Sequence, residues 1–275
     1  MIYELHPKDF KKIKPLLNGL EKNPVINGVI DGNNLGRIYV DQIDSPKAAL
    51  VWVKMELFYL IGISKNSKFN SFIEQFIIQN IKPEALEIGD DCLNLELYPF
   101  DLWNSSINDI FKSQLIKGER VPFQFQKECF CYAKCNPIPS EYQVLRMDQN
   151  LMGLDEKHII REEIKKFWNS LETFFENGFG YCVIKDDEVV GTCISVFVCK
   201  DEYEIGINTY HPRHRGKGLA TAMASEFIKE CLEKGITPHW TTEHFRKDSI
   251  AIANKLGFKQ LPNYQVYYLP FEELI

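Results

Sequence analysis

The C-terminal half of the chain alternates between strand-like and helix-like spacing of apolar residues. Apolar residues recur every three or four positions between Glu156 and Phe175, which predicts one long helix. Polar pairs such as Asp186-Asp187 separate runs of β-branched and aromatic residues, as turns separate strands. The predicted order is strand 142–147, helix 156–175, strands 181–184, 189–198 and 203–210, helix 218–233, strand 238–242, helix 249–256 and strand 265–269.

The N-terminal half also mixes the two patterns. Segment 69–77 has the apolar spacing of an amphipathic helix. No catalytic motif stands out in this half. The predicted strands are 37–40, 48–53, 58–63 and 93–97, followed by a strand-rich stretch at 121–133. The whole chain is therefore predicted to be an α/β protein, in the broad sense that includes α+β folds.

A short proline-containing segment separates the two halves. Within residues 135–140, Pro137 and Pro139 cannot continue a helix or a central strand. We therefore expect an N-terminal α/β domain at 1–136, which would form part of an acceptor site or bind a partner. A second domain is expected at 141–275. The chain length of 275 residues is compatible with two domains.

Composition and charge narrow the possible partners. Hydrophobic residues make up 45% and charged residues 25% of the chain, as in ordinary globular proteins. A net charge of -6 provides no general attraction for nucleic acid or for an anionic membrane surface. The first residues do not resemble a signal peptide, and no segment has the roughly 18 apolar residues of a membrane span. We expect a cytoplasmic protein without nucleic-acid or membrane partners.

The cysteines do not form a recognisable metal motif. The chain has 8 of them, which we expect to be reduced thiols because no signal peptide is visible. Cys129, Cys131 and Cys135 have C-x-C-x3-C spacing, which is not a standard zinc spacing. Cys129 and Cys131 alternate with aromatic residues, as buried positions on a strand do. We therefore favour a core strand here and expect no metal.

The most informative segment joins a predicted strand to a predicted helix at residues 210–220. Gly216 and Gly218 let the backbone turn tightly and leave amide groups uncovered. Those amides, with the positive end of the following helix, form an anion site. Basic side chains surround it, at Arg213, Arg215 and Lys217. The segment lacks the order of a nucleotide P-loop, and Thr221 stands where a Rossmann fingerprint has its third glycine.

The hexamer from Arg215 to Ala220 resembles the coenzyme A pyrophosphate turn of the GNAT N-acetyltransferase superfamily. The order of predicted elements around it is similar to that of a GNAT domain. Segment 249–258, which ends in Lys-Leu-Gly-Phe, looks like the second signature of the superfamily. The chain also resembles a bacterial subgroup, labelled GNAT acetyltransferase, with an added N-terminal domain. That subgroup includes zwittermicin-resistance acetyltransferases.

The resemblance implies a fold and a co-substrate. The second domain should have the GNAT acyl-CoA N-acyltransferase fold, with a mixed, largely antiparallel sheet. The element order of the first domain is compatible with a degenerate copy of it. Acetyl-CoA would be bound as co-substrate. The residues expected to contact it are Asn208, Thr209, Tyr210, Arg213, Arg215, Gly216, Lys217, Gly218, Leu219, Ala220, Thr221 and Ser249.

The proton-transfer residues are less well defined. Several GNAT enzymes place a glutamate base on the strand before the turn, which makes Glu204 the first catalytic candidate. His211 is the second, because histidine titrates near neutral pH. The chain departs from the superfamily at Arg246, where many members have Asn, and at Ala253, where many have a tyrosine acid.

The expected activity is transfer of an acetyl group from acetyl-CoA to a primary amine, most simply of a small molecule. Direct transfer is favoured over an acyl-cysteine intermediate because no cysteine has an evident His/Asp partner. Two alternatives stay open: a non-catalytic acyl-CoA-binding or sensing module, and an acyltransferase that uses another acyl-CoA. The sequence does not identify the acceptor or the oligomeric state.

Overall fold

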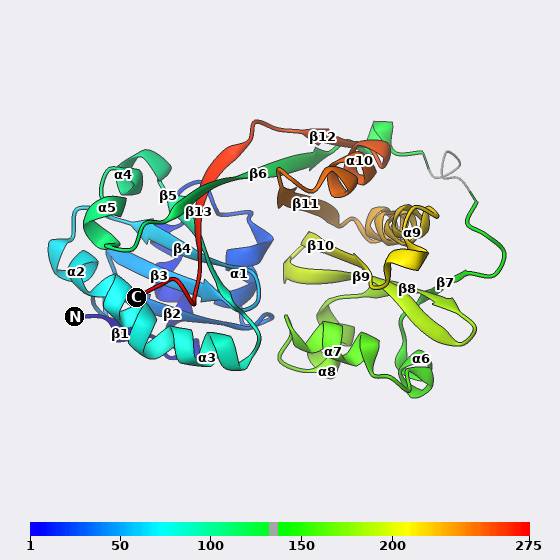
Figure 1. Ribbon diagram of the computed structural model, residues 1–275, viewed down its shortest axis with the longest axis horizontal. Coiled ribbons are helices and arrows are strands. Elements are labelled where there is room, and N and C mark those ends of the chain that lie inside the picture. Colours follow the sequence, from blue (N-terminus) through cyan, green and yellow to red (C-terminus); the bar gives the residue numbers. More distant parts are fainter. Residues whose placement is uncertain (132–136) are drawn as a thin grey trace. The chain divides into compact units, whose positions relative to one another are not determined.

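A computed structural model of the protein describes residues 1–131 and 137–275, and they form two compact units (Figure 1). One unit comprises Arg120–Asn263. The other comprises Met1–Glu119 together with Tyr264–Ile275. The helices and strands follow each other as α/β elements in both, in agreement with the predicted fold class.

The unit Arg120–Asn263 is built on a mixed sheet in the order β6-β11-β10-β9-β8-β7, with β12 also paired to β6. All neighbours are antiparallel except β10 and β11, which are parallel. The strands are β6 (Ile116–Phe125, of which 120–125 belong here), β7 (Gln143–Arg146), β8 (Gly180–Lys185), β9 (Glu188–Cys199), β10 (Glu202–Thr209), β11 (Thr237–Glu243) and β12 (Phe258–Gln260).

Helices cover both faces of this sheet. Figure 1 shows α9 (Leu219–Lys234) on one face, and α7 (Ile159–Lys165) and α8 (Leu171–Asn177) on the other. Helix α9 buries Met223 and Phe227 completely, and it ends at Gly235, whose φ of 70° suits a glycine. Among the described residues of this unit, the remaining helical segments are α6 (Gln149–Leu154), α10 (Lys247–Lys255), and the 3-10 turns η3 (Lys127–Cys129) and η5 (Pro212–His214).

The single helix predicted at 156–175 is wrong, because two helices with separate caps occupy the region. The Asp155 carboxylate accepts backbone N–H groups at the start of α7. The Ser170 hydroxyl accepts the N–H of Thr173, 3.1 Å away, and so begins α8. Between them, the Trp168 indole donates to the carbonyl of Ser195 on β9, at 2.9 Å. Apolar spacing continues across the break, but the capping side chains divide the helix.

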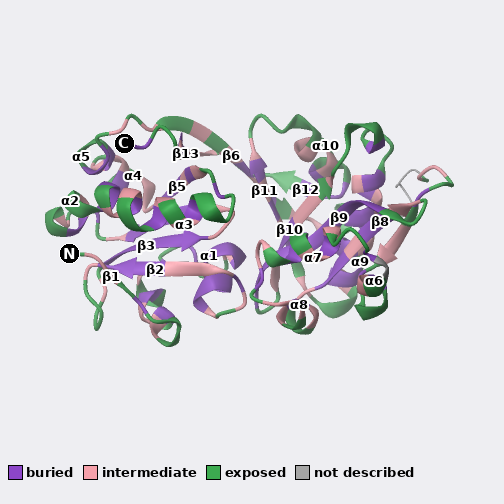
Figure 2. Cartoon of the chain, turned by 60° about the horizontal axis from the view of Figure 1, so that its bottom comes forward, coloured by how far each residue is buried: buried purple, intermediate pink, exposed green. Residues whose placement is uncertain are grey.

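The other unit has a sheet in the order β1-β2-β3-β4-β5-β13, in which only β4 and β5 are parallel. Its core contains the large buried side chains of Trp52, Phe58, Trp103 and Phe271, and Figure 2 shows the buried central strands. The strands are β1 (Tyr3–Glu4), β2 (Gly36–Val40), β3 (Ala48–Val53), β4 (Leu57–Gly62), β5 (Cys92–Tyr98) and β13 (Tyr264–Pro270). The helical segments are η1 (Pro7–Leu16), α1 (Pro24–Ile30), α2 (Ser67–Phe76), the π-helical η2 (Ile77–Ile81), α3 (Lys82–Glu87), α4 (Phe100–Asn104) and α5 (Ile107–Ile110).

The two units repeat one topology. In each, three consecutive antiparallel strands (β2-β3-β4 or β8-β9-β10) are followed by a helical connection. The next strand (β5 or β11) then pairs in parallel with the third of them. In each, a further antiparallel strand then pairs with that parallel strand, β13 with β5 and β6 with β11. The N-terminal unit is therefore a topological copy of the C-terminal one.

The copies exchange their final strands. Residues 120–125 of β6 precede the predicted linker yet pair in the C-terminal unit, whereas β13 follows that unit and pairs in the N-terminal one. The compact units therefore do not coincide with the sequence segments 1–136 and 141–275. Pro137 and Pro139 lie within Arg120–Asn263, and residues 135 and 136 of the proposed linker lie outside the described residues.

The cysteine-rich segment after β6 is not a core strand. Cys129 ends the short η3 turn, and both Cys129 and Cys131 are exposed. Their interpretation as buried strand positions is therefore wrong, and Cys135 lies outside the described residues. None of the helices in the described part of the chain has the length and apolar character needed to cross a bilayer.

The strand exchange predicts how fragments of the chain behave. A fragment of residues 141–275 lacks β6, and so it leaves β11 without a partner and loses the buried Val121. It also carries β13 without its partner β5. We expect it to aggregate, whereas a fragment of residues 120–263 should stay soluble and unfold cooperatively on heating, as followed by circular dichroism. Equal solubility and cooperativity of the two fragments would contradict the exchanged arrangement.

Candidate functional site

Strands β10 and β11 pair over only part of their length. Their parallel ladder joins Glu202 to Thr237 and ends at the pair Glu204–His239. Strand β10 continues to Thr209, while the later residues of β11 pair on its other side with β6. Within the described residues, the end of β10 therefore has a ladder partner on its β9 edge and none on its β11 edge.

The hydrogen bonds between β10 and β9 identify which backbone groups of β10 face that open edge. The Tyr210 N–H donates to the Val190 carbonyl at 3.1 Å, so the backbone of Tyr210 points toward β9. Because backbone groups alternate between the two edges of an antiparallel strand, the N–H groups of Ile207 and Thr209 point to the open edge. The Thr209 carbonyl also faces away from β9, since it accepts from Arg215 Nε at 3.3 Å.

The turn after β10 has the geometry of an anion site. Gly216 and Gly218 have φ angles of 72° and 80°, and a Cβ at either would meet no atom within 4 Å. No side chain caps the start of α9, whose first intrahelical bond runs from the Ala222 N–H to the Gly218 carbonyl. The N–H groups of residues 219–221 therefore have no acceptor within the helix and point out of its positive end.

Cations gather beside this turn. Arg213, Arg215 and Lys217 are exposed, as an incoming anion requires. A pocket of about 510 Å³ lies next to them. It is lined by Tyr142, Lys185, Asp186, Glu188, Val190, Arg213, His214 and Lys217. The side chains of Leu219 and Thr221 are buried, so these two residues can offer only their backbone amides to a ligand.

The sequence analysis did not predict a role for His214. This buried residue links Arg213 in the turn to Tyr142. Its Nε2 accepts from Arg213 Nε at 2.9 Å, because a guanidinium can only donate. The proton of the neutral ring is then on Nδ1 and is donated to the Tyr142 hydroxyl, also at 2.9 Å. Burial, and then the nearby positive charges beginning with that of Arg213, lower the pKa of His214. The ring thus stays neutral and orients Arg213.

The two catalytic candidates differ in their surroundings. Glu204 is 8% exposed and stands at the last paired position of β10, where the two strands part. Its Oε1 accepts the backbone N–H of Thr241 on β11, at 2.9 Å. His211 is exposed, and its Nδ1 accepts the N–H of Arg213 at 3.1 Å as the cap of η5. This bond leaves only Nε2 of His211 available for proton transfer.

The second signature contributes to the core. Ser249 accepts from the buried Trp240 indole at 3.0 Å, so its hydroxyl oxygen already has a partner. Ala253 is completely buried, and Arg246 pairs with Glu243 at 3.7 Å. At the two positions where the sequence departs from the superfamily, Ala253 is therefore a core residue and Arg246 is part of an ion pair.

A buried carboxylate near the end of β10 was also missed. Glu163 on α7 is 7% exposed, and it accepts from Asn208 Nδ2 at 3.2 Å. Tyr210, two residues further, shares a hydrogen bond of 2.7 Å with the Thr192 hydroxyl. In the sequence, Glu163 is one of several charged residues in a predicted helix, and nothing in the apolar spacing distinguishes it from the others.

The equivalent positions of the N-terminal unit are closed. Strands β4 and β5 stay paired from Phe58 to Ile61, almost to the end of β4. The start of α2 is capped by Asn66, whose Oδ1 accepts the Phe69 N–H at 3.1 Å. A Cβ at Gly62, at the end of β4, would collide with the carbonyl oxygen of Lys47. At these equivalent positions the unit thus has neither an open strand edge nor a helix start without a side-chain cap.

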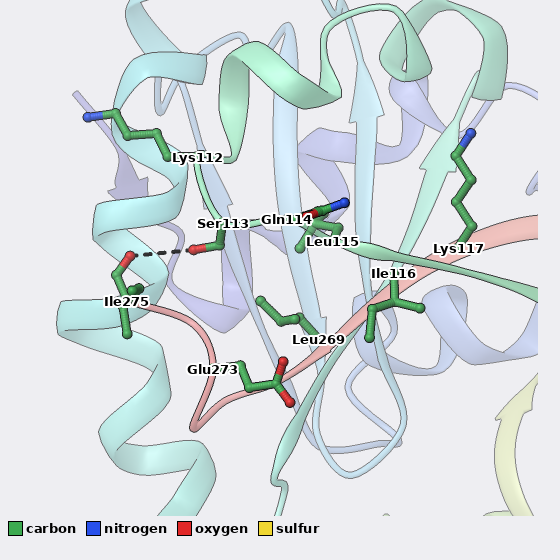
Figure 3. Close-up of a pocket in the computed structure, with 9 residues that line it drawn as sticks. All are labelled: Lys112, Ser113, Gln114, Leu115, Ile116, Lys117, Leu269, Glu273 and Ile275. Carbon is green, nitrogen blue, oxygen red and sulfur yellow. Dashed lines mark hydrogen bonds between the residues drawn. The ribbon is translucent and has the colours of Figure 1, made fainter.

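The N-terminal unit does contain a pocket of its own, of about 930 Å³ (Figure 3). Its charged lining groups are Lys112, Lys117 and Glu273, and the Ser113 hydroxyl donates to the carbonyl of Ile275 at 3.4 Å. It has no histidine or cysteine among its lining residues. Across the described residues, no group of three or more His, Cys, Asp and Glu side chains could hold a metal ion.

Known proteins resemble the chain over almost its whole length. The family model for GNAT acetyltransferase matches residues 14–267. An uncharacterized N-acetyltransferase of Bacillus subtilis (strain 168), YdfB, is 27% identical over 269 residues, which cover 98% of each chain.

Solved structures show the same fold. A GCN5-related N-acetyltransferase-like protein from Streptococcus suis 89/1591 matches with a TM-score of 0.68 and 21% identity, over 94% of this chain and 98% of the other. A tandem GNAT protein from the clavulanic acid biosynthesis pathway matches with a TM-score of 0.58 and 9% identity, over 98% and 99%. The second match agrees with the repeated topology of the two units.

The surroundings of His214 predict its titration. We expect its imidazole, followed by NMR, to gain a proton only below the usual pKa of about 6.5. Replacement of Arg213 by Gln should raise this pKa, because it removes a neighbouring positive charge. Since the pKa is lowered in the folded protein, the stabilisation contributed by His214 is present above pH ~6.5 and is lost as the pH falls through the lowered value. An unchanged pKa in the Arg213→Gln variant would contradict the assigned contact.

Proposed function

Because the chain belongs to the GNAT acetyltransferase family, we propose that it transfers an acetyl group from acetyl-CoA directly to a primary amine. The observation that carries this proposal is the uncapped, glycine-rich start of α9 directly after the open end of β10. The open edge and the anion site belong to one compact unit, so a thioester and its pyrophosphate can be held by neighbouring backbone groups.

The turn fits the pyrophosphate of acetyl-CoA. A Cβ at Gly216 or Gly218 would meet no atom within 4 Å apart from the adjacent residues, and the amides at the start of α9 would donate to phosphate oxygens. Arg213, Arg215 and Lys217 would supply positive charge. The N–H groups of Ile207 and Thr209 on the open edge would donate to the thioester carbonyl, on which negative charge develops during the reaction. Tyr210 would contribute its side chain and not its N–H, which donates to Val190.

The reaction needs one proton acceptor and one proton donor. The amine nitrogen forms a bond to the thioester carbon, the carbon–sulfur bond breaks, and the amine proton is lost to a base. We assign that base to Glu204, directly or through water, because its buried carboxylate lies where β10 and β11 part. The departing thiolate takes up a proton, which cannot come from Ala253. Direct transfer is supported by Cys193, whose complete burial raises the pKa of its thiol well above the usual value.

Two variants of α9 separate phosphate binding from backbone strain. Gly218 and Gly235 flank the helix, both have a positive φ, and a Cβ at either would meet no atom within 4 Å. Gly218→Ala should weaken acetyl-CoA binding by about tenfold to a hundredfold, or about 1.4–2.7 kcal/mol, measured by calorimetry. The control Gly235→Ala introduces similar strain at the other end and should leave the affinity within about twofold. Equal affinities of the two variants would remove the support for a pyrophosphate site.

Two carboxylates of β10 provide a similar comparison for the base. Glu204→Gln should reduce kcat by roughly 10²- to 10⁴-fold with little change in acetyl-CoA affinity, and the loss should shrink at alkaline pH as more amine is deprotonated. Glu202, which pairs with His239 at 2.6 Å, serves as the control. Glu202→Gln should keep kcat within about twofold. Near-normal turnover of the Glu204 variant at neutral pH would redirect the assignment to His211, to be tested with His211→Asn.

The buried alanine at position 253 favours an alternative, an acyl-CoA-binding or sensing module without turnover. Release of free CoA thiol in the presence of a panel of small amines distinguishes the two functions. The same assay with propionyl-CoA and succinyl-CoA tests an acyltransferase specific for another acyl group. We propose a small-molecule amine as the acceptor, and the amine panel would narrow its chemical class.

A further inference from the structure

We propose that Glu163 is a positioning residue for acyl transfer, which holds residues 208–210 of the chain in place from the sheet face opposite α9. The inference rests on the proposed function, since it concerns how the open edge of β10 is kept in its working position. Helix α7, which carries Glu163, packs against β9 on that face.

The carboxylate of Glu163 contacts the end of β10. It accepts from Asn208 Nδ2 at 3.2 Å, and together with burial its charge raises the pKa of the nearby Tyr210 hydroxyl. Lys166 Nζ lies 2.6 Å from its other oxygen and supplies the opposite charge. Glu163 is 7% exposed, so these contacts form largely away from water, where a broken one would be costly.

Tyr210 also contacts β9. The Tyr210 hydroxyl shares a hydrogen bond of 2.7 Å with the Thr192 hydroxyl on β9. Thr192 is 1% exposed. Tyr210 is 37% exposed as a whole residue, but desolvation of its hydroxyl, and then the charge of Glu163, raise its pKa, so the hydroxyl stays protonated.

The contacts of Asn208 and Tyr210 also restrain Thr209, which lies between these two residues. Side chains alternate along a strand, so Asn208 and Tyr210 lie on one face and flank Thr209. The N–H of Thr209 points to the open edge, where β11 no longer pairs, and its carbonyl is held by Arg215. With Glu163 in place, the end of β10 is held by β9, by the turn and by α7. Without Glu163, the side-chain tie to α7 is lost.

Glu230 on α9 provides a matched control. It is also 7% exposed, accepts from a tyrosine hydroxyl (Tyr181, 2.8 Å) and pairs with a lysine (Lys234, 2.7 Å). Its further partner is Arg146 on β7. Glu230 therefore has the same exposure as Glu163 and, like it, pairs with a lysine of its own helix, but its other contacts join α9 to β7 and β8 and not to β10.

The test compares Glu163→Gln with Glu230→Gln in the full chain. For turnover we would use the best acceptor from spermidine, glucosamine, L-lysine and glycinamide, with detection of CoA thiol. Glu163→Gln should lower kcat by about tenfold to a hundredfold and leave the Kd for acetyl-CoA within about twofold. Glu230→Gln should lower Tm but leave kcat within about twofold. A loss of kcat that is equal in both variants would overturn the proposal, because it would reflect general destabilisation.

Two further measurements keep the proposal testable. Tyr210→Phe should reduce kcat, and the double variant with Glu163→Gln should be less impaired than the product of the single effects. Amide hydrogen exchange needs no acceptor: the Tyr210 N–H should exchange faster in Glu163→Gln and not in Glu230→Gln. Independent kinetic effects, or unchanged exchange, would overturn the positioning role. If the wild type binds acetyl-CoA but acetylates no amine, the proposed function fails, and the exchange result still decides whether Glu163 holds the strand.

Discussion

Strand β11 pairs with β10 at its first residues and with β6 at its later ones, so β10 continues past Glu204 with one edge unpaired. A strand edge normally needs hydrogen-bond partners, and in the described residues no strand pairs with this one; the turn that follows leads to a helix whose start has no side-chain cap. The same interruption leaves Glu204 beside the first unpaired residue and Thr209 beside the turn. The open edge of β10 and the position of Glu204 at its beginning therefore both depend on where this one ladder ends.

The two units show that topology alone does not make such a site. They share strand order and direction, but the β4–β5 ladder continues almost to the end of β4, and Asn66 occupies the start of α2 with its own side chain. In the C-terminal unit, the corresponding ladder stops early and Gly218 offers no side chain to the amides of α9. The two units thus share a topology, and a few local hydrogen bonds decide which of them has the open strand edge and the uncapped helix start of the proposed site.

Local signals predicted the turn at Gly216 and Gly218, helix α9 and the meander of β8, β9 and β10, because glycine and apolar spacing act over a few residues. The division of α7 from α8 was missed, since the Ser170 cap competes with an apolar pattern that continues through it. The membership of β13 was also missed, because alternation shows that a strand pairs but not with which partner. His214 and Glu163 acquire their significance only from contacts with residues distant in the sequence.

The exchange of β6 and β13 has a consequence for synthesis of the protein on the ribosome. All residues of the C-terminal unit, 120–263, are made before β13, so that unit can complete its sheet first. The N-terminal unit, although most of it is translated earlier, must wait with the outer edge of β5 uncovered until residues 264–270 arrive. The unit whose residues emerge first can therefore complete its sheet only after the other, and until then the edge of β5 lacks its strand partner.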